Sequence, residues 1–208
     1  MTEDEARDFV AARCRNAAAL GKIERYAELL RQGAGTQNLI AASTLPQIWL
    51  RHIADSVQLI DHVSRGTSSW LDLGAGAGLP GMVIGLLEPE REMVLMESRA
   101  LRIQWLQETI EQLGARNIAV RGGNIRSAAP VAAGVISARA FAPLPRLLDM
   151  AARFSTADTE WVLPKGRSAA QEIAQLPRRQ RAMFHVKPSA TDPEAGIVTG
   201  KGRLEDGA

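Results

Sequence analysis

The chain has 208 residues, 46% of them hydrophobic, which is enough to bury a full core as one domain with an extension. Its 25 basic and 23 acidic residues leave a formal net charge of +2, so a polyanionic partner would have to meet a local basic face. The single Cys14 excludes an intramolecular disulfide, and no cluster of His and Cys predicts a metal site. The acidic N-terminus and the lack of a long apolar run argue against export and membrane insertion. We therefore expect a cytoplasmic protein without a metal.

The first third of the sequence has helical periodicity. An apolar stripe predicts a helix over residues 3–32, which would form a cap on the main domain. The segment Gly33-Ala-Gly35 breaks the pattern, and Pro46 then suits the first turn of a further helix that reaches about residue 60. The Gly-Thr-Ser-Ser run at 66–69 is the predicted hinge into the next part of the chain.

From that hinge onward, strands and helices alternate, which predicts an α/β fold with a mostly parallel sheet. The predicted elements are strands at 70–73, 93–97, 117–121, 133–137 and 159–163, and helices from 80, at 99–113 and at 144–153. A helix at 168–176 and strands at 182–186 and 196–199 would follow, the strands closing the sheet as an antiparallel pair. We divide the chain into a helical extension, 1–65, and an α/β domain, 66–208, which together form one compact unit.

The most informative segment joins the first predicted strand to the helix after it. Asp72 lies in that strand, and the following loop has glycine at positions 74, 76 and 78. Glycine tolerates positive φ and has no Cβ, so such a loop can turn sharply and offer its N–H groups to a ligand at close range. Pro80 suits the start of the helix. The segment therefore predicts the nucleotide-binding unit of a doubly wound fold.

Two classes of cofactor fit this loop. Gly76-x-Gly78-x-x-Gly81 satisfies a dinucleotide pattern, which places a pyrophosphate at a helix N-terminus. A carboxylate at Asp72 would repel a pyrophosphate but could pair with the ammonium of S-adenosylmethionine, which has no phosphate. Glu97, at the end of the next predicted strand, could accept the ribose hydroxyls of either cofactor. The sequence favours S-adenosylmethionine and leaves the dinucleotide open.

Residues that follow the other strands complete the predicted site, because ligands bind beyond the carboxyl ends of the strands in such sheets. The backbone of segment 122–126 could contact an adenine edge while Ile125 packs on the ring. Arg139 and Phe141 follow the fourth strand and would suit a base and its phosphate, although a surface ion pair and a core ring would also explain them. Lys165 follows the fifth strand, where it is either a ligand or solvated.

Residues that are missing also restrict the chemistry. Methylation of a pyrimidine C5 needs a cysteine nucleophile, and Cys14 lies in the extension. Methylation of an exocyclic amine needs polar acceptors, but the loop after the fourth strand reads Ser-Ala-Arg139-Ala-Phe141. A lone pair with no proton to lose, such as guanine N7, needs no general base. Catalysis would then consist of alignment and electrostatics, with no obligatory catalytic residue.

Four segments together resemble one family, the glucose-inhibited division protein B family of bacterial 16S ribosomal RNA guanine-N7 methyltransferases. They are Asp72 to Gly81, Arg51-His52-Ile-Ala-Asp55-Ser56, Ser137 to Phe141, and Lys165-Gly166. The resemblance covers residues 22–187. It implies a class I methyltransferase fold with an N-terminal helical cap, S-adenosylmethionine as the donor, and a guanine in the decoding region of the small-subunit RNA as the acceptor. We expect 16S rRNA or the small ribosomal subunit as the partner of a monomer.

The resemblance also implies roles for residues at matching positions. Gly74 and Leu79 match cofactor contacts of the glycine loop, Ile125 and Arg126 match contacts after the third strand, and Arg139 matches an arginine at the rim where the methyl group is transferred. With the residues identified above, the expected cofactor site comprises Asp72, Gly74, Gly76, Gly78, Leu79, Glu97, Ile125, Arg126 and Arg139. The expected RNA contacts are Arg51, His52, Phe141 and Lys165.

The chain departs from the family pattern in three places, one of which is Arg126, where relatives commonly have an acid after the third strand. A Trp-Asn-Lys segment that is common in relatives reads Gly33-Ala-Gly-Thr here, and Leu101 replaces a basic residue.

Arg178-Arg179-Gln-Arg181 gives the C-terminal third a basic face that could meet phosphates. Arg51 and Asp55 also fit a plain i, i+4 helix pair. A methyltransferase for a small molecule or a protein, and a dinucleotide-dependent oxidoreductase, remain alternatives.

Overall fold

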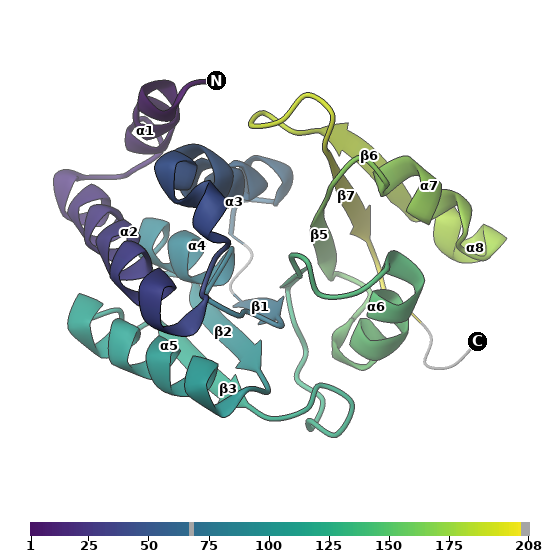
Figure 1. The fold of residues 1–208 in the computed structure, drawn as a ribbon. Helices are drawn as coiled ribbons and strands as arrows, with labels where there is room; N and C mark the ends of the chain where they lie inside the picture. Colours follow the sequence, from purple (N-terminus) through teal and green to yellow (C-terminus); the bar gives the residue numbers. More distant parts are fainter. Residues whose placement is uncertain (67–68, 205–208) are drawn as a thin grey trace.

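The computed structural model describes residues 1–66 and 69–204 and contains one sheet with helices on both faces (Figure 1). The predicted hinge lies partly outside the described residues. Within them the strand order is β3-β2-β1-β4-β5-β7-β6. The strands are β1 (Ser69–Leu73), β2 (Glu92–Glu97), β3 (Ile118–Gly122), β4 (Val135–Ser137), β5 (Glu160–Lys165), β6 (Phe184–Pro188) and β7 (Gly196–Lys201).

Strands β1 to β5 run parallel, and β7 pairs antiparallel with both β5 and β6. The strand order reverses between β1 and β4, which is the switch point where ligands bind in open α/β sheets. The predicted α/β class, the parallel sheet and the antiparallel closure are confirmed.

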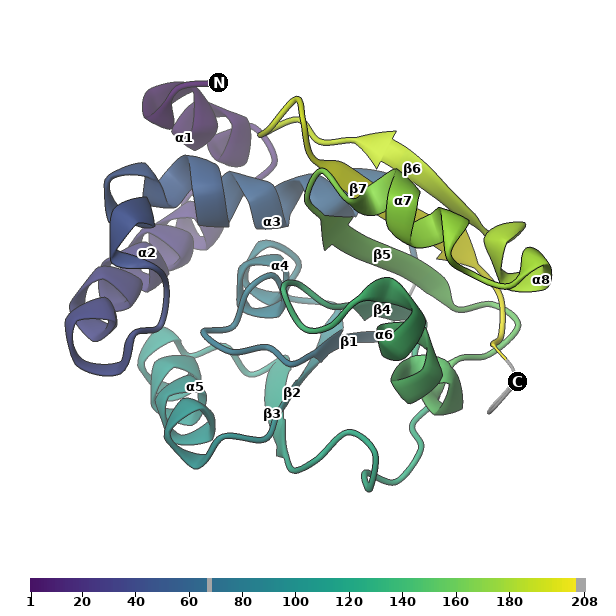
Figure 2. The same ribbon diagram turned by 45° about the vertical axis from the view of Figure 1, so that its right-hand side comes forward.

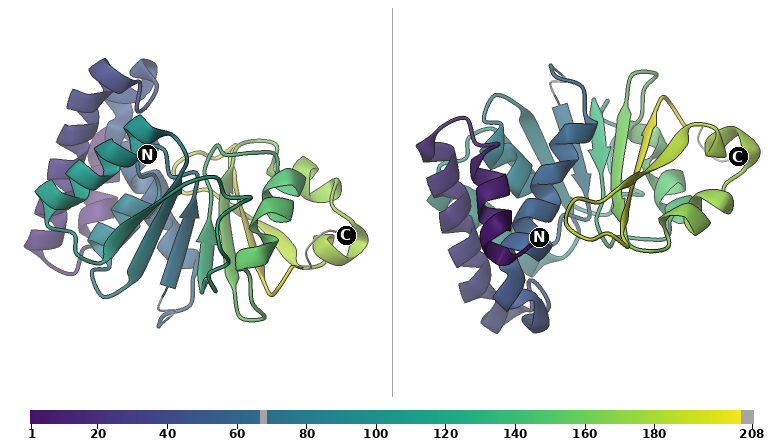
Figure 3. Two further views of the ribbon diagram at one scale, coloured as in Figure 1. Left: turned by 90° about the horizontal axis from the view of Figure 1, so that it is seen from below. Right: turned by 90° about the horizontal axis from the view of Figure 1, so that it is seen from above.

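Helices cover the two faces of the sheet unequally, as Figures 2 and 3 show. The N-terminal elements are α1 (Glu3–Ala11), α2 (Ala17–Gln37), the 3-10 helix η1 (Ala42–Gln47), the π-helix η2 (Trp49–Ala54), α3 (Asp55–Val57) and the 3-10 helix η3 (Gln58–His62). The later ones are α4 (Gly81–Leu87), α5 (Ala100–Leu113), α6 (Leu144–Ala151), the 3-10 helix η4 (Ala152–Phe154), α7 (Ala169–Ala174) and α8 (Arg178–Arg181). One hydrophobic cluster joins α2, η2, α4 and α5 to the sheet, and a second lies under α6 and α7.

Side chains of β1 alternate between these two clusters with the period of a strand. Trp70 belongs to the first cluster, whereas Leu71 and Leu73 belong to the second. Asp72 therefore points to the face covered by α4, where its carboxylate reaches the first turn of that helix. The sequence pattern of β1 thus places one acid beneath the glycine loop.

The helical extension differs from the predicted pattern at several points. The single helix predicted over 3–32 is wrong, because the chain leaves the helix after α1 and restarts at α2, where the Asn16 side chain accepts the Ala19 N–H at 2.9 Å. The glycines at 33 and 35 lie inside α2, which ends only at Asn38 in the left-handed conformation. Pro46 lies inside η1 and not in the first turn of an α-helix. Helix α8 was not predicted.

Two polar contacts tie the extension to the rest of the molecule. The Glu3 carboxylate accepts the N–H groups of Trp49 and Leu50 at 2.8 and 2.9 Å, so α1 caps the start of η2. The buried Tyr26 hydroxyl of α2 donates to the Ala77 carbonyl of the glycine loop at 2.7 Å. The extension therefore supports the loop directly. No helix within the described ranges has both the length and the apolar character needed to cross a bilayer.

Candidate functional site

The loop between β1 and α4 adopts the glycine-dependent conformation expected from its sequence. Gly74, Gly76 and Gly78 have φ values of 68°, 57° and 93°. A Cβ on Gly74 would lie 2.2 Å from Cδ2 of Phe141, and one on Gly78 would lie 2.9 Å from Cβ of Met82. At both positions the backbone conformation and the close neighbours exclude a larger residue.

Asp72 lies under this loop and is fully buried. Its carboxylate accepts the Gly81 N–H at 2.9 Å and the Ser137 hydroxyl at 2.7 Å. Burial raises its pKa to about 6, against the opposing effects of these two hydrogen bonds and of Arg139. Asp72 is not among the residues that line the neighbouring cavity. Both of its oxygens are engaged, so the structure gives it a role in shaping the loop, and direct pairing with an ammonium remains only a prediction.

Glu97 ends β2 beside the same loop. One of its carboxylate oxygens accepts the Gly76 N–H at 2.9 Å, and the other accepts the N–H groups of Ser98 and Arg99 at 2.7 and 2.9 Å. The side chain is only 7% exposed but borders the cavity. Glu97 therefore holds the loop close to the end of β2 and presents a carboxylate at the predicted position.

A cavity of about 650 Å³ opens beyond the carboxyl ends of β1, β2 and β3. Gly74, Gly76, Leu79, Glu97, Ile125, Arg126 and Arg139 line it. Gly78 does not line it, and atoms of Tyr26, Met82 and Leu106 lie within 3.1 Å of the position that a Cβ on Gly78 would take. Arg126 is exposed and lies 3.7 Å from Asp149 of α6, so only part of it faces the cavity. Most of the residues predicted to contact a cofactor thus converge on one site.

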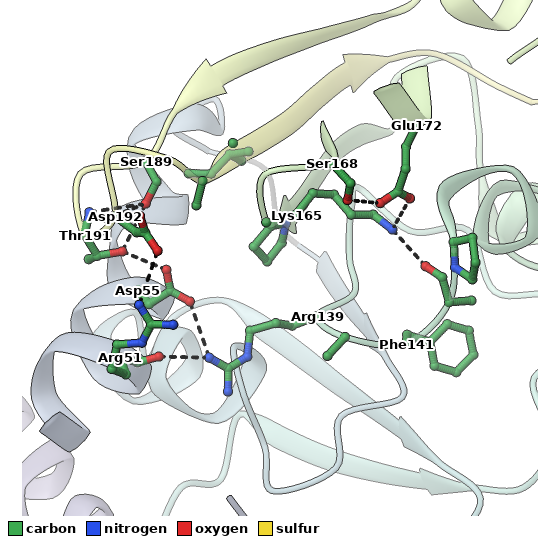
Figure 4. Close-up of a pocket in the computed structure, with 18 of the residues that line it drawn as sticks. Arg51, Asp55, Arg139, Phe141, Lys165, Ser168, Glu172, Ser189, Thr191 and Asp192 are labelled. Atoms are coloured by element: carbon green, nitrogen blue, oxygen red, sulfur yellow. Dashed lines mark hydrogen bonds and ion pairs between the residues drawn. The ribbon is translucent and has the colours of Figure 1, made fainter. Parts of the chain in front are cut away.

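Arg139, after β4, is held by three acceptors from η2 and α3, and Figure 4 shows its contacts with Arg51 and Asp55. Its guanidinium donates to the Arg51 carbonyl at 3.2 Å, to the Asp55 carboxylate at 3.3 Å and to Nδ1 of His52 at 3.1 Å. Asp55 was recognised only as part of a motif, and its pairing with Arg139 joins positions 84 residues apart. The rim arginine is therefore preorganised by the helical extension.

His52 is a neutral part of this arrangement. Burial, Arg139 and Arg51 lower its pKa to about 3. Since Nδ1 accepts from Arg139, Nε2 carries the proton and donates to the Thr44 hydroxyl at 2.7 Å. The hydroxyl donates in turn to the Ala41 carbonyl. His52 acts here as a hydrogen-bond acceptor and holds no charge near neutral pH.

Lys165 is paired, which argues against the solvated side chain that the sequence left open as one alternative. Its ammonium donates to the Glu172 carboxylate at 2.9 Å and to the Ala142 carbonyl at 2.8 Å, so it ties the loop after β4 to α7 (Figure 4). Burial opposes ionisation of Glu172, but bonds from Ser168, Lys165 and Leu144 outweigh it and lower its pKa. No local sequence pattern identifies Glu172 as the partner of Lys165.

A second cavity, of about 900 Å³, lies beyond β4 and β5. Arg51, His52, Phe141 and Lys165, the four predicted RNA contacts, all line it. Its far wall is the connection between β6 and β7, where Thr191 donates to Asp55 at 2.9 Å and Asp192 pairs with Arg51 at 3.3 Å. Sequence reasoning missed both residues of this connection. The segment 139–141 lines both cavities, so the two spaces meet at the predicted methyl-transfer rim.

Solved structures with similar folds have low sequence identity to this chain. The mitomycin 7-O-methyltransferase MmcR has a TM-score of 0.57 at 14% identity, covering 87% of this chain and 67% of that one. A mutant of MtNAS in complex with S-adenosylmethionine gives 0.55 at 17% identity, over 97% and 78%. A TehB-like SAM-dependent methyltransferase from Corynebacterium glutamicum gives 0.54 at 13%, over 86% and 97%. These likenesses show that the chain has the fold of class I methyltransferases.

Sequence comparison identifies the family. The model of the GidB family, rRNA small subunit methyltransferase G, matches residues 19–192. The ribosomal RNA small subunit methyltransferase G of Erythrobacter litoralis is 50% identical over 98% of both chains, and that of Rhizorhabdus wittichii is 47% identical over 95% of this chain and 92% of its own. The chain belongs to the GidB family of rRNA small subunit methyltransferases. The predicted family, fold and enzyme class are confirmed, and the oxidoreductase alternative falls.

No group of three or more metal-ligating side chains occurs in the described ranges 1–66 and 69–204.

Proposed function

We propose that this protein transfers a methyl group from S-adenosylmethionine to N7 of a guanine in the decoding region of 16S rRNA. The observation that carries the proposal is the junction of two cavities at the segment 139–141, one beside the glycine loop and one beyond β4 and β5. A donor in the first cavity and a base in the second would meet at this segment. An rRNA substrate assigns the protein to the cytoplasm.

The cavity beside the glycine loop suits the donor in size and chemistry. A volume of about 650 Å³ falls within the usual range of cofactor sites. Positive φ at Gly74 and Gly76 lets backbone approach the ligand, while Glu97 at the end of β2 is placed to accept ribose hydroxyls. Leu79 and Ile125 supply apolar surface for the adenine. Asp72 supports the site from below, where its carboxylate binds the Gly81 N–H.

The acceptor base would enter the second cavity against Phe141. This ring packs over Gly74 and lies between the two spaces, so it can stack on a base that has left its strand. Arg51, His52 and Lys165 would frame the base from their fixed positions in the same cavity. Their hydrogen bonds and ion pairs preorganise this wall before the RNA arrives.

Methyl transfer to N7 requires little proton transfer by the protein. When bound, S-adenosylmethionine supplies a methyl group on a sulfonium, so that the N7 lone pair forms the new N–C bond while the C–S bond breaks toward sulfur. No proton leaves N7, which agrees with a His52 that is neutral and already accepts from Arg139. The residues at the rim therefore hold donor and acceptor in line. Arg139 is the charged group at this junction, and Asp55 and His52 fix its orientation.

The test is a methylation assay with labelled S-adenosylmethionine on small subunits or naked 16S rRNA from cells that lack this chain, followed by mapping of the label. We expect label at one guanine N7. Arg139→Ala should lower kcat by at least ~10-fold, as expected when a positioning contact is lost, and should weaken S-adenosylhomocysteine binding by a smaller factor, because Arg139 also lines the donor cavity. Arg167→Ala, an exposed arginine paired with Glu194, is the matched control. A protein that binds S-adenosylhomocysteine but labels no RNA would point to a small-molecule or protein acceptor.

A further inference from the structure

The cavity beside the glycine loop carries more positive charge than its proposed cofactor explains. Arginines at five positions line it, namely Arg99, Arg102, Arg126, Arg139 and Arg146. The only lining carboxylate among the described residues is Glu97, whose oxygens already accept three backbone N–H groups. S-adenosylmethionine has a net positive charge, so a ring of cations does not favour its binding. These arginines therefore point to a second, anionic ligand at the same mouth.

Every Arg and Lys that lines the second cavity has an acidic partner, whereas Arg99, Arg102 and Arg146 of the first cavity have none among the described residues. Arg51 pairs with Asp192 at 3.3 Å, and Lys165 pairs with Glu172 at 2.9 Å. Arg139 likewise pairs with Asp55 at 3.3 Å. Phosphates would have to compete with these carboxylates. The second cavity is thus suited to a base and not to a sugar-phosphate backbone.

Arg99 and Arg146 stand out within the arginine ring. Both are exposed, and neither side chain forms an ion pair or hydrogen bond with any residue of the described ranges. Arg99 follows β2 at the start of α5, and Arg146 lies in the first turn of α6 after β4, so the two flank the cavity mouth from opposite sides of β1. Arg102 lies close enough to Arg99 to be affected by its charge: burial lowers the pKa of Arg102 most, and the charge of Arg99 lowers it further.

We propose that the RNA backbone crosses the mouth of the cofactor cavity, that Arg99 and Arg146 bind its phosphates from the two sides, and that the target base turns past Phe141 into the second cavity. This inference rests on the proposed function and adds the path of the strand. Exposed arginines provide forked donors for phosphate oxygens without first breaking an internal ion pair. The partner is a single-stranded or locally opened RNA segment, because only an unstacked base can enter the second cavity.

The basic helix α8 is an alternative surface for binding the RNA backbone. Three residues of α8 are exposed and have no ion-pair partner among the described residues, namely Arg178, Arg179 and Arg181. In this respect they resemble Arg99 and Arg146 at the cavity mouth. However, α8 immediately precedes β6, which runs in the same direction as β5 because both pair antiparallel with β7. Helix α8 therefore lies at the amino end of β6 (Figure 2), whereas the cavities lie beyond the carboxyl ends of the parallel strands. It provides a control of the same residue type, exposure and charge.

The experiment measures RNA affinity against salt for the full chain with S-adenosylhomocysteine bound. Each lost phosphate contact should reduce the slope of log K against log salt by about 0.7 for a single strand. We expect this reduction for Arg99→Ala and Arg146→Ala and about twice as much for the double variant. Arg178→Ala/Arg179→Ala should keep the wild-type slope. Arg99→Lys and Arg146→Lys should retain most of it, because an ammonium still binds a phosphate as a point charge.

The outcomes separate this inference from the proposed function. A wild-type protein that methylates one guanine N7, with an unchanged slope in the Arg99→Ala/Arg146→Ala variant, would overturn the path and leave the function intact. An equal loss in the α8 variant would also overturn it. If the two arginine variants lost S-adenosylhomocysteine affinity, their role would be in cofactor binding and the inference would fail. A wild-type protein that methylates no RNA would refute the proposed function itself.

Discussion

The buried carboxyl of Asp72 makes the stability of the protein depend on pH. Its pKa is raised from 3.8 to about 6, mainly by burial. The folded state then binds a proton more tightly than the unfolded state, so this contribution to stability is present below about pH 4 and is lost as the pH rises through about 6. The shift corresponds to roughly 3 kcal/mol of unfolding free energy. In Asp72→Asn, the uncharged amide can accept the Gly81 N–H through its oxygen, while its NH2 group donates to the Ser137 hydroxyl, which then accepts where it donated before.

We therefore expect the unfolding free energy of Asp72→Asn to exceed that of the wild type increasingly between about pH 4 and pH 7. Urea titrations at several pH values measure this difference. Asp158→Asn, at an exposed carboxyl, serves as the control and should follow the wild-type profile. If the unfolding free energies of Asp72→Asn and the wild type changed in parallel with pH, burial of the Asp72 charge would not destabilise the protein.

At the residue scale, the sequence predicted the positions of the site residues better than it predicted their hydrogen-bond partners. Asp72 was placed correctly within its strand and Glu97 at the end of the next, and Lys165 was placed just beyond the strand that it ends, because short apolar runs locate strands to within a few residues. Their bonds to Ser137, Gly76 and Glu172 join distant parts of the chain, and no local pattern encodes such pairs.

At the scale of elements, the loops after β1 and β4 are fitted against each other. The Phe141 ring occupies the space where a Cβ on Gly74 would lie, at 2.2 Å. Gly74→Ala should therefore lose stability through both positive φ and displacement of the ring. In Gly76→Ala the nearest atom to the new Cβ is 3.8 Å away, so only the backbone cost of about 1–2 kcal/mol should remain.

Denaturant unfolding of both variants tests this fit, with Phe141→Ala added to each. Removal of the ring should recover part of the Gly74→Ala loss and none of the Gly76→Ala loss, which is the coupling expected of residues in contact. Equal losses in the two glycine variants would mean that the ring moves away at no cost.

Element boundaries were predicted well for the strands and poorly for the helices of the extension. Gly33 lies inside α2, where the side chains of Leu39 and Trp105 pack so close to its backbone that a Cβ would clash with them. The break before α2 depends on the Asn16 cap, and Asn is also common in helix surfaces, so periodicity alone did not reveal it. The antiparallel closing pair was predicted, but the insertion of β7 between β5 and β6 was not.

For the whole molecule, we propose that the extension and the α/β domain unfold together. A single hydrophobic cluster includes Val10 and Tyr26 of the extension and Leu95 and Ile197 of the sheet. Urea unfolding followed by far-UV circular dichroism and by tryptophan fluorescence should therefore give coincident transitions. Trp49 in η2 and Trp161 in β5 report on the two parts. An early fluorescence change confined to Trp49, measured in single-tryptophan variants, would show that the extension melts separately.

The shared wall at 139–141 links the occupancy of the two cavities. A ligand on one side that orders or shifts this segment changes the free energy of binding on the other side, and thermodynamic linkage requires that the effect be the same in both directions. If donor binding tightens the hold on the base by some factor, the base tightens the hold on the donor by that factor. Once the methyl group has moved, both ligands differ from those that bound, so the same wall also couples the release of the two products.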